Sequence, residues 1–255
     1  MTTAVITIVS GRHEHLARQI AAIDPATDHI LVAMNDPKIA EMYPHLQAIH
    51  LSTAPTLPLA EARNLGARTA IEKGADLLVF LDVDCIPMPG MIARFEAGPR
   101  ETLLTGAVGY LPKNSLQASD ATFHSFRPRP APGEIIVGDP LLFWSLSFAC
   151  TAAVWTRIGG FDEMYRGYGG EDTDLALRAQ SAGVEVAWVG GAEALHQFHP
   201  TQSPPTEHLD DILRNGALFA DRWGFWPMRG WLDEFEQLGL VSQGADGSYS
   251  RKDRA

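Results

Sequence analysis

Two aspartates at the end of an apolar run carry the first chemical signal in this sequence. In LVFLDVDCIP, Asp82 and Asp84 are two positions apart and Pro87 follows them. Strand side chains alternate between faces, so two such carboxylates converge only where a strand ends or bulges, and the proline favours an ending strand. Hard divalent cations take oxygen ligands of this kind and share them with phosphate. Two solvated turn aspartates would produce the same pattern, so the pair alone leaves both interpretations open.

A second acidic pair follows a run of glycines. In GYGGEDTDLALRAQSAG, Gly167, Gly169 and Gly170 allow the backbone to approach a ligand closely, and Glu171 and Asp172 come where a helix is expected to begin. Carboxylates at that position can simply cap the helix and oppose its dipole. The chemical alternative is that one carboxylate accepts a proton from an acceptor hydroxyl while the other positions that acceptor.

The segment ALHQFHP adds two histidines, His196 and His199. Manganese accepts imidazole, and one histidine beside two carboxylates would form a mixed donor set. A single histidine is more often structural, so we expect one of the two to complete the metal site without deciding which. The three signals come in a fixed order along the chain, and together they are more specific than any one of them.

The elements that must position these residues alternate between strand and helix. We expect strands over 4–10, 29–36 and 75–87, with helices over 13–23 and 57–74 between them. This order predicts right-handed crossovers and a mostly parallel sheet. Ligands bind beyond the carboxyl ends of such strands. The polar residues at these predicted strand ends are Ser10, Arg12, Asn35, Asp36, Asp82 and Asp84.

The second half of the chain has weaker periodicity. Residues 101–112 resemble a further strand, and 112–138 are rich in proline, serine and charge, which indicates a mobile loop near the site. A strand and turn are expected over 140–160, a helix from about Glu171, and a strand pair over 184–200. Residues 206–238 look helical, and we expect 241–255 to be a disordered tail.

Composition narrows the classes of function. The chain has 255 residues, 45% of them hydrophobic, and a net charge of −11, which disfavours disorder and non-specific nucleic-acid binding. Cys85 and Cys150 are too few for a zinc cage and are expected to be free buried thiols. With no signal peptide and no apolar run of about 20 residues, we expect a soluble cytoplasmic protein, with peripheral membrane contact left open.

The segment WTRIGGFDEMYRGYGGEDTDLALRAQSAG, together with the DxD strand, resembles the glycosyltransferase-A superfamily, and in particular its family-2-like enzymes. Its GGFDE…GGED plan is similar to the C-terminal module of β-1,4-galactosyltransferases and polypeptide N-acetylgalactosaminyltransferases. The resemblance covers residues 3–200 and implies a single α/β domain with a Rossmann-like sheet. We divide that domain into a nucleotide-binding half (1–105), an acceptor and sugar half (106–205) and a helical extension (206–240).

The resemblance implies a role for each matching residue at the donor nucleotide. The turn Ser10-Gly11-Arg12 is similar to the place where these enzymes hold the nucleotide. Asn35 and Asp36 match the position that often reads uracil or ribose. The implied donor is therefore a nucleotide-diphospho-sugar, with uridine expected and guanosine as the alternative.

The resemblance also implies the metal and diphosphate contacts. Arg63 matches a basic residue near the diphosphate, Asp82 the DxD residue that faces ribose or sugar, and Asp84 the residue that binds the metal. His196 or His199 matches the C-terminal histidine ligand, with His196 slightly favoured by its shorter spacing. Manganese is the implied cofactor, with magnesium as the alternative.

On the acceptor side, Trp144 matches residues that line the sugar pocket, and Gly169 and Gly170 match the loop against the donor. Glu171 and Asp172 match the acidic pair of the family, and in inverting members the second acid is the general base. The acceptor would be a glycan, a lipid or a small molecule. The sequence departs from the family pattern in two ways. Tyr168 replaces the usual tryptophan, which leaves donor and acceptor preference open. We also expect no transmembrane stem before the domain, which favours a bacterial enzyme.

Two other classes use some of the same residues. A metal-dependent hydrolase would use the aspartates and histidines to activate water, and a non-catalytic sugar-nucleotide or glycan-binding protein would keep the DxD strand but need no base. A nicotinamide dehydrogenase is disfavoured because SGRHEH, and not GxGxxG, follows the first strand.

Overall fold

The strand–helix alternation of the first third of the chain builds one half of an eight-stranded sheet. The computed structural model describes residues 1–52 and 56–252. Strands β1 to β4 are mutually parallel, whereas β9 runs antiparallel to both β4 and β6. The predicted α/β fold with a Rossmann-like sheet is confirmed, and its second half is mixed. In sheet order the strands are β3 (Gln47–Leu51), β2 (Asp28–Met34), β1 (Thr3–Val9), β4 (Leu77–Leu81), β9 (Ser147–Thr151), β6 (Leu103–Thr105), β10 (Val186–Val189) and β8 (Ile135–Val137).

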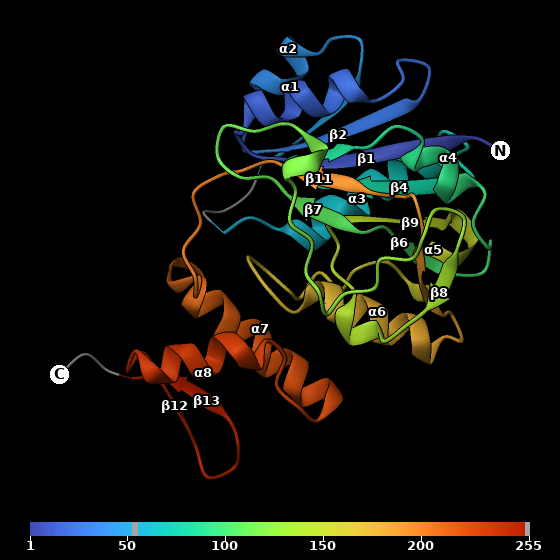
Figure 1. Ribbon diagram of the computed structural model, residues 1–255. Coiled ribbons are helices and arrows are strands. Elements are labelled where there is room, and N and C mark those ends of the chain that lie inside the picture. The colour runs from blue at the N-terminus through green and yellow to red at the C-terminus, as the bar shows by residue number, and fades with distance from the viewer. Residues whose placement is uncertain (53–55, 253–255) are drawn as a thin grey trace.

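Helices cover both faces of this sheet, and Figure 1 shows α3, α5 and α6 on one side with α1, α2 and α4 on the other. Alternating strand residues explain the two layers, because Ile6 and Phe80 pack with α3 and α5 while Val5 and Val79 pack with α4. The helices are α1 (His13–Ala22), α2 (Lys38–Met42), α3 (Leu59–Glu72), α4 (Met91–Glu96), α5 (Ala152–Ile158) and α6 (Glu171–Ser181).

A small second sheet forms at the carboxyl ends of the central strands. It contains β5 (Cys85–Pro87), β11 (Ala194–His196) and β7 (Val108–Tyr110), with β11 in the middle. The single strand expected over 75–87 is therefore divided, because β4 ends at Leu81 and a turn through the aspartates leads into β5. The strand expected over 101–112 is likewise divided into β6 and β7, one in each sheet.

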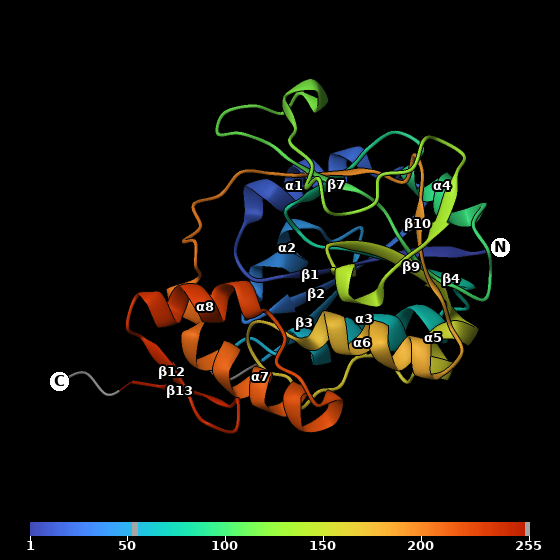
Figure 2. The same ribbon diagram turned by 60° about the horizontal axis from the view of Figure 1, so that its bottom comes forward.

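The segment 112–138 has more regular structure than its composition predicts. It contains a short 3-10 helix, η1 (Ala118–Asp120), a bridge between Tyr110 and Thr122, and the edge strand β8, which pairs with β10. The prediction of a structureless loop is wrong for these residues, because backbone pairing with β7 and β10 replaces the missing side-chain periodicity. Figure 2 shows the part with η1 projecting from the body of the molecule. Its mobility stays a prediction.

The C-terminal part forms its own small layer beside the start of α6 (Figures 1 and 2). The helical region expected over 206–238 is confirmed, with a break, and is followed by a hairpin. The elements are η3 (Thr206–His208), α7 (Leu209–Trp223), α8 (Arg229–Gln237), β12 (Val241–Gln243) and β13 (Tyr249–Arg251).

A disordered tail from residue 241 is a wrong expectation for residues 241–252. Val241 and Tyr249 are buried against Leu232 and Phe235 of α8, so the hairpin completes an apolar core that the two helices alone would leave open. Residues 253–255, the rest of the expected tail, lie outside the described residues. Across 1–52 and 56–252, no helix is both long and apolar enough to cross a membrane.

Candidate active site

One buried side chain, that of Gln19, holds the backbone of the turn that carries Asp82 and Asp84. Gln19 of α1 donates from its amide nitrogen to the carbonyl of Asp82 at 2.7 Å and to the carbonyl of Cys85 at 2.9 Å. The Asp82 N–H donates to the carbonyl of Leu146 at 3.0 Å. The turn therefore has its backbone held at both ends, which pre-orients the two carboxylates.

Gln19 is itself held by a fully buried polar chain. The Thr7 hydroxyl donates to the Gln19 amide oxygen at 2.8 Å, and it lies 3.0 Å from Nε2 of His29. Burial lowers the pKa of His29 to about 4, so this imidazole is neutral at physiological pH. The Thr7 and Gln19 side chains are therefore hydrogen-bonded although both are fully buried.

Strand register brings two histidines to Asp84. In the small sheet His196 lies opposite Cys85 on β5 and opposite Tyr110 on β7. Nε2 of His196 lies 3.6 Å from Asp84 Oδ1, and Nε2 of His199 lies 3.3 Å from Asp84 Oδ2. One ligand atom from each of the three side chains falls within 4.8 Å of the other two. Both histidines, and not one, therefore lie at the predicted metal site.

The charges around Asp84 keep it ionised. Its burial favours the neutral acid, but the hydrogen bond of His199 and the charges of His196 and Arg12 outweigh this and lower the pKa of Asp84 to about 2. Arg12 Nη1 donates to Asp84 Oδ2 at 2.9 Å. Burial lowers the pKa of His196, which leaves its imidazole neutral and able to donate a lone pair. One carboxylate and two imidazoles are a donor set that fits a divalent cation such as manganese.

Arg63 of α3 connects the DxD turn to the second acidic pair. Its guanidinium is buried and donates to Asp82 Oδ1 at 3.0 Å and to Glu171 Oε1 at 3.4 Å. Burial and the charges of Asp84 and Asp172 raise the pKa of Asp82 to about 6 in spite of Arg63. The guanidinium thus bridges two carboxylates, and the predicted role of Arg63 at a diphosphate stays a prediction.

The acidic pair Glu171 and Asp172 opens α6, as predicted. Gly170, at φ +89°, is the residue before the helix, and Glu171 is buried with its Oε2 lacking a hydrogen-bond partner among the described residues. Burial raises the pKa of Glu171, helped by the adjacent charge of Asp172, and burial also raises the pKa of Asp172. Asp172 accepts from the Thr173 N–H at 2.7 Å. Two carboxyls that resist ionisation are suited to taking up a proton.

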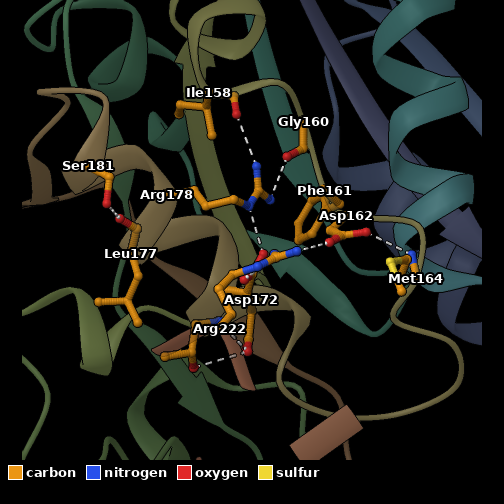
Figure 3. Close-up of polar contacts among 12 residues, drawn as sticks. Ile158, Gly160, Phe161, Asp162, Met164, Asp172, Leu177, Arg178, Ser181 and Arg222 are labelled. Carbon is orange, nitrogen blue, oxygen red and sulfur yellow. Dashed lines mark hydrogen bonds and ion pairs between the residues drawn. The ribbon is translucent and has the colours of Figure 1, made fainter. Parts of the chain in front are cut away.

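A third acid of the same helix has a structural role that sequence reasoning missed. Asp174 is fully buried, accepting from Arg178 Nε at 2.7 Å, from Arg222 Nη1 at 2.7 Å and from Trp223 Nε1 at 3.0 Å. Figure 3 shows Arg178 directed at the carbonyls of Ile158 and Gly160, and Arg222 reaching Asp162. The spacing of Asp174 and Arg178, four residues apart on a helix, was the available signal.

The predicted nucleotide-binding turn lies at adjacent strand ends. Gly11 and Arg12 both have positive φ, and the Gly11 N–H donates to Asp36 Oδ2 at 3.2 Å. His13 Nε2 lies 2.6 Å from the same oxygen. Burial opposes the ionisation of Asp36, but the hydrogen bond and charge of His13 and the Gly11 N–H lower the pKa of this carboxyl. Ser10 directly follows β1, which ends at Val9, and leads into this turn.

The Asn35 position is set by its backbone. It has φ +54°, and its N–H donates to the carbonyl of Leu51 at 3.0 Å. Asn35 and Asp36 therefore follow β2 directly, beside the turn that follows β1. This is the arrangement expected when neighbouring parallel strands end together.

Aromatic and basic groups from the 112–138 segment contact Tyr110 and Trp144. The Arg127 guanidinium lies 4.4 Å from the centre of the Trp144 ring, which follows the 3-10 turn η2 (Pro140–Leu142). Tyr110 lies between His124 and His196, with ring centres 4.9 Å apart in both cases. Sequence reasoning missed Tyr110 and Arg127, because neither lies in a motif and only strand register and chain reversal bring them in.

The glycine loop before α6 is also a packing surface. Gly169 has φ +97°, and a Cβ there would lie 2.7 Å from the Met228 sulfur. Tyr168 stacks on His208 with ring centres 4.7 Å apart and lies 5.7 Å from Trp231. The loop is thus held between the acidic pair and the C-terminal layer.

Known proteins resemble this chain in sequence and in fold. The family model described as the N-terminal domain of galactosyltransferase matches residues 143–200. Validoxylamine A glucosyltransferase of Streptomyces hygroscopicus subsp. jinggangensis (strain 5008) is 30% identical, over 54% of this chain and 40% of its own length. The chain thus covers less than half of that curated relative.

Two solved structures share the architecture. The crystal structure of GalNAc-T7 with UDP, GalNAc and Mn2+ has a TM-score of 0.61 at 13% identity, covering 93% of this chain and 57% of that one. The crystal structure of S. aureus TarS 1-349 has a TM-score of 0.58 at 13% identity, covering 86% and 64%. The sheet with its flanking helices resembles glycosyltransferase-A structures, and the segment matched by the galactosyltransferase model contains the GGED turn.

Proposed function

We propose that this protein transfers a sugar from a nucleotide-diphospho-sugar to an acceptor hydroxyl. One observation carries the proposal. The donor set of Asp84, His196 and His199 is joined through Asp82 and Arg63 to the carboxyl pair at the start of α6. When a hydroxyl displaces a diphosphate, a bound cation can neutralise the leaving group and a carboxylate can accept the proton of the hydroxyl. The proposed site contains residues for both tasks.

The metal ligands in this proposal are Asp84, His196 and His199, and the metal is manganese, with magnesium as the alternative. A carboxylate oxygen and two imidazole nitrogens suit manganese better than magnesium, which prefers oxygen alone. A cation held there supplies positive charge that neutralises the leaving diphosphate. The superfamily member GalNAc-T7 was crystallised with UDP and Mn2+, which supports the same assignment here.

The nucleotide would lie at the ends of β1 and β2. Asp36, held ionised by His13 and the Gly11 N–H, offers an acceptor for ribose or base donors, and Asn35 offers an amide. Uridine is the proposed base, with guanosine as the alternative. Asp82, between the metal ligands and Arg63, is the proposed contact to ribose or sugar.

Asp172 is the proposed general base, and the transfer would invert the anomeric configuration. Burial raises the pKa of Asp172, which makes its carboxylate a better proton acceptor than that of an ordinary aspartate. Glu171, fixed by Arg63, would orient the acceptor hydroxyl beside it. The hydroxyl oxygen attacks the anomeric carbon, its proton passes to Asp172, and the bond to the diphosphate oxygen breaks.

The test is thermal stabilisation by a panel of nucleotide-sugars with and without manganese, because a ligand that binds only the native state raises Tm. We expect a UDP-sugar with manganese to raise Tm. Because the sequence relative is a validoxylamine A glucosyltransferase, UDP-glucose and validoxylamine A are the first donor and acceptor to assay. A metal-dependent hydrolase has no reason to bind UDP, and a non-catalytic binding protein would bind it without product. Stabilisation by manganese alone, with none by any nucleotide-sugar, would refute the proposal.

A further inference from the structure

We propose that Arg127, on the segment between β7 and β8, binds the phosphates of the donor and supplies a positive charge that the protein's own carboxylates do not neutralise. The inference rests on the proposed function and adds a residue to it. Arg127 belongs to none of the motifs in the sequence and lies 16 positions or more from each of them along the chain.

The three guanidiniums around the site differ in their partners. Arg12 contacts Asp84, and Arg63 contacts Asp82 and Glu171. Arg127 has no carboxylate within ion-pair distance anywhere in residues 1–52 and 56–252. Its Nε donates to the carbonyl of Leu142 at 3.1 Å, while its Nη2 is buried without a hydrogen-bond partner.

The position of Arg127 is fixed from two sides. On one side it lies over the Trp144 ring, and the next residue, Ser145, directs its N–H to the carboxylate of Asp172. On the other side its charge acts on Tyr110, whose ring lies 4.9 Å from that of the metal-site residue His196. Arg127 therefore lies between the proposed base and the proposed metal ligands, where a leaving diphosphate would be.

Energetics favour an anionic ligand at this arginine. A half-buried guanidinium without a counter-ion loses hydration that only a hydrogen-bonded anion can replace. Burial lowers the pKa of Arg127, in agreement with this cost. The chain has a net charge of −11, so nearby acids would repel a diphosphate unless an uncompensated cation attracts it. Arginine offers a planar fork that matches phosphate oxygens.

A purely structural role is the alternative. In that case the contacts with Leu142 and Trp144 only hold the segment in place, and the void of about 10 Å³ beside Arg127 would contain at most one water for Nη2. A phosphate cannot fit in that void, and the Trp144 ring covers one face of the guanidinium, so a phosphate must reach N–H groups at an edge of the guanidinium that neither covers. The two roles predict different responses to the phosphates of a nucleotide.

Titration calorimetry in manganese with a nucleoside diphosphate and its parent nucleoside separates the two roles. The probe pair is UDP and uridine, or GDP and guanosine if the wild type prefers them. The variants are Arg127→Ala and Arg127→Lys, with Arg129→Ala as control because Arg129 pairs with Glu193 outside the site. We expect R127A to weaken diphosphate binding tenfold or more and nucleoside binding less than twofold, with R127K intermediate and R129A unchanged.

Equal weakening of diphosphate and nucleoside would overturn the proposal in favour of a structural role, and so would unchanged binding of both. If R127A fails to fold, R127K decides the matter by the same ratio. A wild type that binds no nucleoside diphosphate refutes the proposed function itself, which is a different outcome from a wild type that binds and an R127A variant that binds equally well.

Discussion

The turn after β4 and the start of α6 each present two acids, but the surroundings of the two pairs differ. Asp84 has Arg12, His196 and His199 around it, and these hold its pKa at about 2. Glu171 and Asp172 share Arg63 with Asp82 and lie in a buried site, which raises the pKa of both. The first pair is suited to stay charged and hold a cation, and the second to receive a proton.

The comparison extends within α6 itself. Asp174 lies two residues after Asp172, yet its carboxylate is completely enclosed by Arg178, Arg222 and Trp223. Side chains two positions apart on a helix point in different directions, so one acid reaches the site and the other the interface with α7. The residue type alone therefore does not determine the role.

The largest effect is expected from Asp172→Asn. Loss of the general base should lower kcat about 10²- to 10⁴-fold while nucleotide-sugar binding changes little, because the amide keeps the volume but cannot accept the proton. The measurement is nucleotide release with the donor and acceptor that the wild type uses. Asp120→Asn, at an exposed aspartate on η1, is the control. Near-normal turnover of D172N would remove Asp172 as the base.

Asp174→Asn should affect stability and not chemistry. Replacing this buried carboxylate leaves Arg178 with carbonyl partners and Arg222 with Asp162, and the lost charge pairing should cost about 3–5 kcal/mol in the free energy of unfolding. Urea denaturation measures this, with Asp233→Asn on the exposed face of α8 as the control. The folded fraction of D174N should retain activity. Wild-type stability in D174N would show that the ion network does not anchor α6 to α7.

Gln19→Met should weaken the metal site from a distance. The variant keeps the volume of the side chain but removes both donors to the DxD turn, and loss of such supporting contacts lowers metal affinity about 10- to 100-fold. The readout is the manganese concentration that gives half-maximal UDP binding. Gln180→Met, on the exposed side of α6, should leave it unchanged. An unchanged manganese requirement in Q19M would mean that the turn holds its own geometry.

The smallest expected effect is a shift in the pH dependence of kcat/KM caused by Glu171→Gln. Asp172 acts only when ionised, so kcat/KM should fall as pH drops through its raised pKa, above the range of an ordinary aspartate. Glu171→Gln removes a neighbouring negative charge, which makes ionisation of Asp172 easier. The acid limb of the profile should therefore move to lower pH, by about 0.5–1 unit. A limb that moves to higher pH would contradict the assignment.

The sequence predicted most of what local patterns encode. The strands of the parallel half, the helix that starts at Glu171 and the placement of both acidic pairs at element ends follow from apolar runs, glycines and the proline after the DxD turn. The confirmed fold also followed from the resemblance carried by the GGED segment. These features depend on neighbours along the chain, which a single sequence shows.

Features that depend on distant pairing were not predicted from local patterns, and one histidine was expected beside Asp84 only from the order of the motifs and the resemblance. The register of β11 between β5 and β7 brings both histidines and Tyr110 to Asp84, and no local pattern encodes that register. The C-terminal hairpin was read as disorder because its sequence is polar, whereas two buried side chains, Val241 and Tyr249, are enough to fix it on α8. Arg127 likewise gains its position through contacts that no local pattern encodes, with the Leu142 carbonyl and the Trp144 ring.

The most direct test of the division of labour between the two acidic pairs is calorimetric binding of UDP in manganese to the wild type, Asp84→Asn and Asp172→Asn. We expect D84N to lose tenfold or more in UDP affinity, because an amide is a poorer cation ligand than a carboxylate. D172N should bind UDP like the wild type. Unchanged binding by D84N, or a loss in D172N as large as that in D84N, would contradict it.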